Sequence, residues 1–72
     1  MSKKKREEVR LKDLQIGKVY WSNYYNEYII YIEVDFDFDY VFEFTSKSGY
    51  CVPELNNIEE APAIIQLLYG KD

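Results

Sequence analysis

The sequence predicts a mainly β or α+β fold, in which a small antiparallel, strongly curved sheet or partly open barrel of about four strands precedes a C-terminal helix. Apolar and polar side chains alternate over residues 28–44 with the period of a β-strand. The last apolar run, within residues 61–70, has the spacing of a helix. With 72 residues, the chain is expected to form one domain, residues 11–72, after a mobile basic tail, residues 1–10.

The first expected strand is KVYWSN, residues 18–23, and it ends in the polar turn Ser22–Asn23. Before it, Leu14 and Ile16 occupy alternate positions and Gly17 breaks the run. The GKVY opening of this strand resembles the strand openings of SH3-like barrels, although no specific motif of that fold accompanies it. The resemblance implies that a barrel, if one forms, is of the SH3-like type.

The tract from Tyr28 to Phe44 is too long for one straight strand. It would run ~56 Å at about 3.3 Å per residue, which exceeds the size of so small a domain. A turn is expected between Asp35 and Asp39, because Asp is rare in strands and common in turns. All even positions are apolar, so the even side chains of both arms are expected to face the core. The expected pairs are Val34 with Tyr40, Ile32 with Phe42 and Ile30 with Phe44. A strongly bent strand that passes between two sheets is the alternative.

Shorter patterns define the next segments. Residues 45–49 (TSKSG) form an expected turn in which Gly49 can take a positive φ. Residues 50–53 (YCVP) form a short expected strand, which Pro53 restricts to an edge or an end of a sheet. Residues 53–60 are expected to be a loop. Its candidate helix caps are Asn56 and Asn57.

The last expected element is the helix in APAIIQLLYG, residues 61–70. Pro62 suits a first helical turn, and Gly70 suits the position after the last turn. A strand is the alternative interpretation, because the apolar run is short.

Charge is unevenly distributed along the chain. Residues 1–10 hold five basic and two acidic side chains, whereas residues 11–72 hold four basic and eleven acidic ones. The net charge of −4 therefore divides into +3 on the tail and −7 on the domain. An acidic domain repels nucleic acid and attracts basic surfaces, so direct nucleic-acid binding is not expected and the expected partner is a protein with a basic surface.

The residue inventory excludes several kinds of chemistry. A single cysteine, Cys51, and no histidine exclude an internal disulfide, a structural zinc site and a Ser-His-Asp triad. Cys51 is expected to be a small core residue. No apolar run approaches the ~20 residues of a membrane span, and no apolar segment of a signal peptide follows the basic start. We therefore expect a non-enzymatic protein of the reducing cytoplasm that uses no cofactor.

Asp35, Asp37 and Asp39 have the D-x-D-x-D spacing that opens a calcium-binding loop. The match ends there, because the sixth loop position is Tyr40 and the twelfth is Ser46, where Gly and Glu are required. In an extended strand the carboxylates would lie ~6.7 Å apart, too far to share an ion. No metal site is expected. The aspartates either keep an aromatic hairpin soluble or form a row of negative charge that binds a basic partner and imitates a phosphate track.

The resulting hypothesis is an acidic protein-binding module, a small regulator or inhibitor of the kind that phages and mobile elements encode. It would occupy a basic surface of its partner, including a nucleic-acid-binding site. Aromatic anchors would join the acidic groups, since Tyr31 is expected on the same strand face as Glu33. The candidate partner-binding residues are Glu33, Asp35, Asp37, Asp39, Glu43, Tyr24, Tyr25 and Tyr31. The alternatives are a small nucleic-acid-associated barrel that uses the basic tail and tyrosines, or an accessory subunit whose aromatics are buried in a homo-oligomer.

Overall fold

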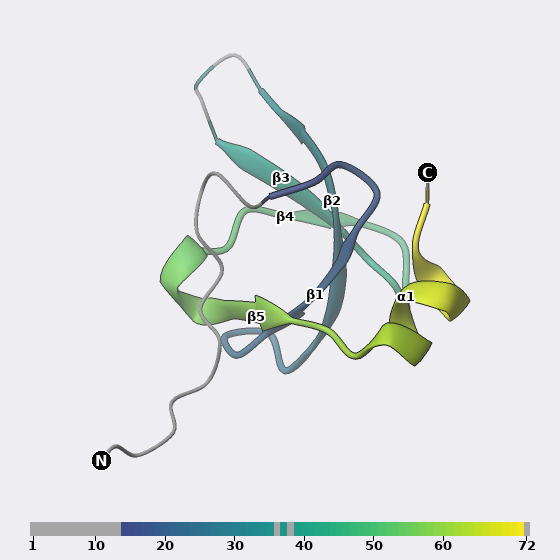
Figure 1. Ribbon diagram of the computed structural model, residues 1–72. Helices are drawn as coiled ribbons and strands as arrows, with labels where there is room; N and C mark the ends of the chain where they lie inside the picture. Colours follow the sequence, from purple (N-terminus) through teal and green to yellow (C-terminus); the bar gives the residue numbers. More distant parts are fainter. Residues whose placement is uncertain (1–13, 36, 38, 72) are drawn as a thin grey trace.

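The computed structural model describes residues 14–35, 37 and 39–71. The expected tail, Phe36 and Phe38 lie outside this part. The described chain forms one antiparallel sheet of five strands in the order β4-β3-β2-β1-β5, followed by a short helix (Figure 1). The elements are β1 (Val19–Ser22), β2 (Glu27–Val34), β3 (Tyr40–Phe44), β4 (Tyr50–Cys51), the 3₁₀ helix η2 (Leu55–Asn57), β5 (Ile58–Glu60) and α1 (Ala63–Tyr69). The sheet is curved and not closed, which confirms the predicted fold class.

The turn between β1 and β2 begins at Ser22, as predicted. Ser22 is fully buried, and its Oγ accepts a hydrogen bond of 3.0 Å from the Tyr25 N–H. The Ser22 carbonyl accepts a hydrogen bond of 2.8 Å from the Asn26 N–H, which closes the turn. Asn26 has a φ of 59°. Asn is one of the few residues that tolerate this left-handed conformation.

The tract 28–44 turns as predicted, and Val34 pairs with Tyr40. The other two expected pairs are wrong. The register shifts between Tyr31 and Glu33, so that Ile32 is an extra residue in β2 opposite a regular β3. The observed pairs beyond this bulge are Tyr31 with Phe42, Ile30 with Glu43 and Ile29 with Phe44.

The bulge changes which side of β2 faces the core. One inserted residue reverses the inward and outward positions of a strand. In β3 the even residue Phe42 is fully buried, as predicted, whereas in β2 the odd residues Ile29 and Tyr31 face the same core. The expectation that even side chains of both arms line this core is therefore correct for β3 and wrong for β2. There the even residue Ile30 is buried outside the cluster, and Val34 is 43% exposed.

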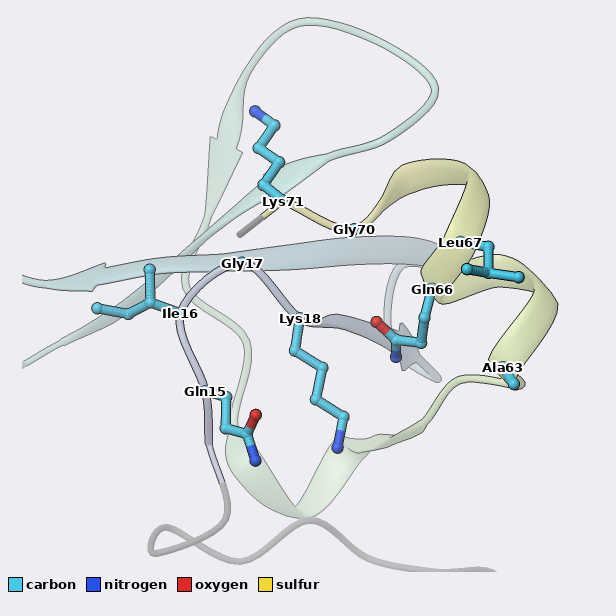
Figure 2. Close-up of a pocket in the computed structure, with 9 residues that line it drawn as sticks. All are labelled: Gln15, Ile16, Gly17, Lys18, Ala63, Gln66, Leu67, Gly70 and Lys71. Carbon is cyan, nitrogen blue, oxygen red and sulfur yellow. The ribbon is translucent and has the colours of Figure 1, made fainter.

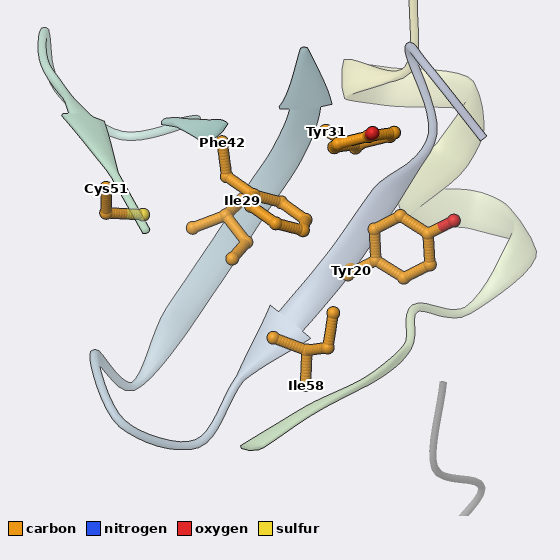
Figure 3. Packing of buried hydrophobic residues seen from close by; sticks show 6 residues of the cluster. All are labelled: Tyr20, Ile29, Tyr31, Phe42, Cys51 and Ile58. Carbon is orange, nitrogen blue, oxygen red and sulfur yellow. The ribbon is translucent and has the colours of Figure 1, made fainter. Parts of the chain in front are cut away.

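The core is an aromatic cluster under the concave sheet (Figure 3). Phe42 lies at its centre, with its ring edge-on to Tyr20 at 6.1 Å and tilted against Tyr31 at 5.2 Å. Edge-on and tilted rings are the favoured arrangements of aromatic pairs. The cluster consists of Tyr20, Ile29, Tyr31, Phe42, Cys51 and Ile58. Cys51 is buried among these side chains, as predicted.

The predicted loop 53–60 is wrong in part, because it contains η2 and β5. β5 pairs with β1, and its first residue, Ile58, is fully buried opposite Ser22. Neither asparagine supplies a side-chain cap, since the N-cap position of η2 is Glu54. The Asn57 carbonyl instead accepts a hydrogen bond of 2.8 Å from the Asn23 N–H. This bond joins η2 to the β1–β2 turn.

Gly49 takes a φ of 126°, which agrees with the expected turn before β4. The predicted helix is also confirmed as α1, with Pro62 at its N-cap. Gly70 ends the helix at a φ of −63° and not in the left-handed conformation that such a glycine usually adopts. No helix in the described ranges is long and apolar enough to cross a membrane.

Candidate functional site

The end of the β2–β3 hairpin projects beyond the rest of the sheet (Figure 1). The pairing of β1 with β2 ends at Ile30, and β4 pairs with β3 only at Phe42 and Glu43. The last residues of the hairpin therefore pair only with each other. We define the acidic tip as Glu33, Asp35, Asp37 and Asp39, the four candidate residues at this projecting end.

Asp35 builds the loop of the acidic tip. Its Oδ1 accepts hydrogen bonds from the backbone N–H groups of Asp37 at 2.9 Å and Asp39 at 3.0 Å. Its own N–H donates to the Asp39 carbonyl at 3.0 Å, which closes the hairpin. Aspartate is common in such turns because its side chain can satisfy backbone donors two and more residues ahead.

This loop brings the three aspartate side chains together. One carboxylate oxygen of each lies within 4.8 Å of the others, with Asp37 and Asp39 exposed and Asp35 half-buried. The predicted row of carboxylates ~6.7 Å apart is therefore wrong for these residues, because they lie in a turn and not along an extended strand. The charges form a compact cluster, which does not have the regular spacing of a phosphate track.

The acidic tip has no basic partner among the residues that the structure describes. In this part of the chain, ion pairs join Lys18 to Glu60, Lys47 to Glu27 and Lys71 to Glu43. All three lie outside the acidic tip. Its negative charge is consequently not neutralised within this part of the molecule, and it attracts cations and basic surfaces.

Glu43 does not belong to the acidic tip. Its Oε1 accepts a hydrogen bond of 2.9 Å from Lys71 Nζ, which follows α1. It pairs with Ile30 on one side and Tyr50 on the other, in the middle of the sheet. The structure therefore separates Glu43 from the acidic tip. Its ion pair with Lys71 helps to hold the C-terminal segment against the sheet.

Tyr24 and Tyr25 lie in the β1–β2 turn, at the opposite end of β2. Tyr24 is 73% exposed and stands edge-on to Tyr25 at 4.8 Å, and Tyr25 stands edge-on to Phe44 at 5.2 Å. A strand of eight residues spans about 26 Å at 3.3 Å per residue. The predicted single face of acidic groups and tyrosines is therefore not formed.

Tyr31 is the clearest correction among the candidate residues. Its side chain is only 6% exposed, because the bulge at Ile32 places it on the core face and not beside Glu33. Burial, with the nearby Tyr40, raises the pKa of its hydroxyl. A partner protein has no access to this ring, so Tyr31 acts in the core.

Two apolar surfaces were missed by the sequence reasoning. Val34 is exposed beside Glu33 at the acidic tip, and the helix α1 exposes Ile64, Leu67 and Leu68. A signal for the second surface was present in the sequence. A helix of seven residues cannot turn both of its sides inward, yet residues 63–69 are apolar almost throughout.

The thiol of Cys51 is not activated as a nucleophile. Burial, and secondarily Glu27, raises the pKa of the Cys51 thiol to about 11, although Lys47 acts in the opposite direction. The thiol is therefore protonated at neutral pH, whereas only the thiolate form of cysteine is a good nucleophile. The arrangement suits binding by charge and exposed apolar groups. No protein-family model, curated protein or solved structure matches this chain.

Proposed function

We propose that this protein is a non-enzymatic binding module whose acidic tip docks on a basic surface of a partner protein. Its role would be that of a small regulator or inhibitor, because a bound module of this size covers the surface that it occupies. The site is narrower than the sequence predicts, since Glu43, Tyr24, Tyr25 and Tyr31 are not part of it.

The observation that carries this proposal is the convergence of three carboxylates at a projecting loop. Like charges within 4.8 Å of one another repel, and within the described ranges no lysine or arginine relieves the repulsion. The hydrogen bonds of Asp35 nevertheless hold the loop in this form. Basic groups of a partner would relieve the repulsion, so the loop is already arranged for such a partner before it binds.

Two contributions to binding follow from the geometry. The exposed carboxylates of Asp37 and Asp39 attract a basic surface at long range and accept charge-assisted hydrogen bonds from Lys or Arg at contact. Val34, which precedes Asp35 and pairs with Tyr40 at the base of the loop, is exposed and offers an apolar contact. The first contribution raises the rate of association, whereas the second slows dissociation.

The proposal is tested by affinity capture from a lysate of the cells that carry the gene, at low and high salt. The variant Asp37→Asn/Asp39→Asn removes two charges but leaves Asp35 in place to hold the loop. We expect the wild-type chain to retain basic proteins at 50 mM salt, and the variant to lose most of them. Retention should also fall at 0.5 M salt, because the Debye length shortens to a few ångströms.

A matched control is Glu54→Gln/Glu59→Gln, which makes the same change in net charge at residues away from the acidic tip. This control should retain the same proteins as the wild-type chain. If Asp37→Asn/Asp39→Asn retains them equally well, the acidic tip is not the binding site. If both variants lose them equally, the overall charge is responsible and the proposal is wrong.

A further inference from the structure

The outer edge of β1 is covered in two different ways along its length. β5 pairs with β1 from Tyr20 to Ser22. At the preceding residue, Val19, the side chain of Gln66 in α1 takes the place of a strand. Its Oε1 accepts a hydrogen bond of 2.8 Å from the Val19 N–H, and its Nε2 donates one of 2.6 Å to the Val19 carbonyl. Two residues of an antiparallel ladder exchange hydrogen bonds in this pattern, so the Gln66 amide imitates the backbone of a neighbouring strand.

The chain after α1 extends this cover beyond Val19. The Lys71 N–H donates a hydrogen bond of 2.7 Å to the Gly17 carbonyl, just before β1 begins. The Lys71 side chain is also attached to the sheet, since its Nζ lies 2.9 Å from Glu43 Oε1. The C-terminal segment therefore covers the edge where β5 has ended. We define the C-terminal latch as residues 62–71, which consist of α1 and the residues beside it.

The C-terminal latch is attached by polar contacts and buries little apolar surface. No residue of α1 is buried, and Leu67 is 82% exposed. The helix is thus the reverse of an ordinary surface helix, which turns its apolar side inward. An open groove of about 670 Å³ lies between the helix and the chain that enters β1 (Figure 2). Its lining includes the polar side chains of Gln15, Lys18, Gln66 and Lys71.

The sheet is held together in a different way. Tyr20, Ile29, Phe42 and Ile58 are fully buried in its core. A hydrogen bond contributes little net stability in water, and an ion pair between exposed side chains contributes less. A helix of seven residues is too short to be stable alone. Once its contacts with the sheet break, the helix is therefore expected to unfold with them, at a lower cost than unfolding of the sheet.

We propose that the C-terminal latch opens and closes as a unit while the sheet stays folded, and that it thereby controls access to the edge of β1 at Val19. The closed latch prevents a strand of another chain from pairing at this position. The open latch leaves the N–H and the carbonyl of Val19 unpaired, as on any exposed strand edge. This proposal does not rest on the function of the acidic tip.

The test is native-state hydrogen exchange of the full chain, followed at single amides by NMR at urea concentrations below the unfolding transition. The N–H groups of Val19, Gly70 and Lys71 make hydrogen bonds to the latch or within it. They should exchange through one common opening that depends little on urea, because it exposes little surface. The Tyr31 N–H bonds to the Lys18 carbonyl on the inner edge of β1. It should exchange at least about a hundredfold more slowly, through global unfolding.

Gln66→Ala distinguishes a cooperative latch from an isolated contact. It removes both hydrogen bonds to Val19 but favours the helix, because Ala is the strongest helix former. The hydrogen bonds of the Gly70 and Lys71 N–H groups go to backbone carbonyls and are not removed. Exchange at these two amides should nevertheless become about tenfold faster, as expected when a latch loses part of its attachment. Exchange at Tyr31 should stay unchanged.

The matched control is Leu67→Ala, which truncates an exposed side chain of the same helix. Its exchange rates should equal those of the wild type. If exchange at Val19 in the wild-type chain depends on urea as steeply as exchange at Tyr31, the latch opens only when the sheet unfolds and the proposal is overturned. It is also overturned if Gln66→Ala speeds exchange at Val19 alone, because the contact is then local and the segment does not open as a unit.

Discussion

Phe42 is the residue on which the core depends most. It is fully buried, it contacts the rings of Tyr20 and Tyr31, and it pairs with Cys51 across β3 and β4. Its side chain thus joins the hairpin to the strands on both sides. A truncation at this position removes contacts from three strands at once.

The first prediction compares Phe42 with Asp37. Phe42→Ala should lower the free energy of unfolding by about 3–5 kcal/mol, because it loses apolar burial and leaves a cavity. Asp37→Asn should leave it nearly unchanged, because the side chain is exposed and only its backbone N–H takes part in the loop. Urea denaturation of both variants measures this difference. Small and equal losses would contradict the inward and outward assignment of the hairpin.

The second prediction concerns Cys51 and pH. Its pKa is raised by burial from 9.0 to about 11, so the folded state binds this proton more tightly than the unfolded state does. The resulting stability is present below about pH 9 and is lost as the pH rises through 11. Between these values, the wild-type free energy of unfolding should fall more steeply than that of Cys51→Ala, by at most about 1.4 kcal/mol per pH unit. Parallel slopes in urea denaturation would show that the thiol does not contribute.

At the scale of the elements, the β2–β3 hairpin divides at its bulge into two functional parts. Before Ile32 the strands pair within the sheet and supply the core, and after it they pair only with each other and carry the acidic tip. Bulges often occur where a sheet redirects side chains toward a functional end. Here the bulge moves Tyr31 into the core and leaves Glu33 and Val34 at the surface.

The third prediction concerns the loop of the acidic tip. Asp35→Ala removes the acceptor of two backbone N–H groups, whereas Asp35→Asn keeps an oxygen in the same place. Amide hydrogen exchange of Asp37 and Asp39 should therefore become about tenfold faster in Asp35→Ala, as expected for a hydrogen bond of ~1.4 kcal/mol. Exchange in Asp35→Asn should stay close to the wild-type rate. Unchanged exchange in both variants would mean that the side chain does not hold the loop.

The fourth prediction concerns calcium. The turn removes one objection to a shared ion, because the three carboxylates lie within 4.8 Å of one another. The other objection stands, since the loop lacks the glycine and the bidentate glutamate of a calcium loop, and Asp35 Oδ1 already accepts two hydrogen bonds. Millimolar calcium should not raise the melting temperature. A saturable rise that Asp37→Asn abolishes would show that this expectation is wrong.

The elements differ in how far the sequence predicts them. The hairpin turn follows from strand period and length, the edge position of β4 from Pro53, and α1 from helical spacing, all of which are local signals. The bulge leaves no such signal, because Ile29, Ile30, Tyr31 and Ile32 are all apolar and fit either register equally well. β5 is hidden for a different reason: two of its three residues are acidic, and it exists by pairing with a strand far away in the sequence.

At the scale of the whole molecule, the chain separates its exposed features in space. The acidic tip lies at one end of β2 and the β1–β2 turn, which holds Tyr24, lies at the other, while α1 lies near the C-terminus (Figure 1). Charge pattern alone identifies the acidic residues as candidates. It cannot predict which of these residues lie close together. That depends on the loop that Asp35 closes and on the ion pair between Glu43 and Lys71.

The most direct test of the proposed function is the association rate constant with a captured partner, measured by stopped flow at 50 mM and 0.5 M salt. At low salt, Asp37→Asn/Asp39→Asn should associate several-fold more slowly than the wild type and the Glu54→Gln/Glu59→Gln control, with little change in dissociation. This difference should disappear at high salt, where screening acts within a few ångströms. Equal association rates of variant and wild type at 50 mM salt would contradict the account and leave the acidic tip only the task of keeping the hairpin soluble.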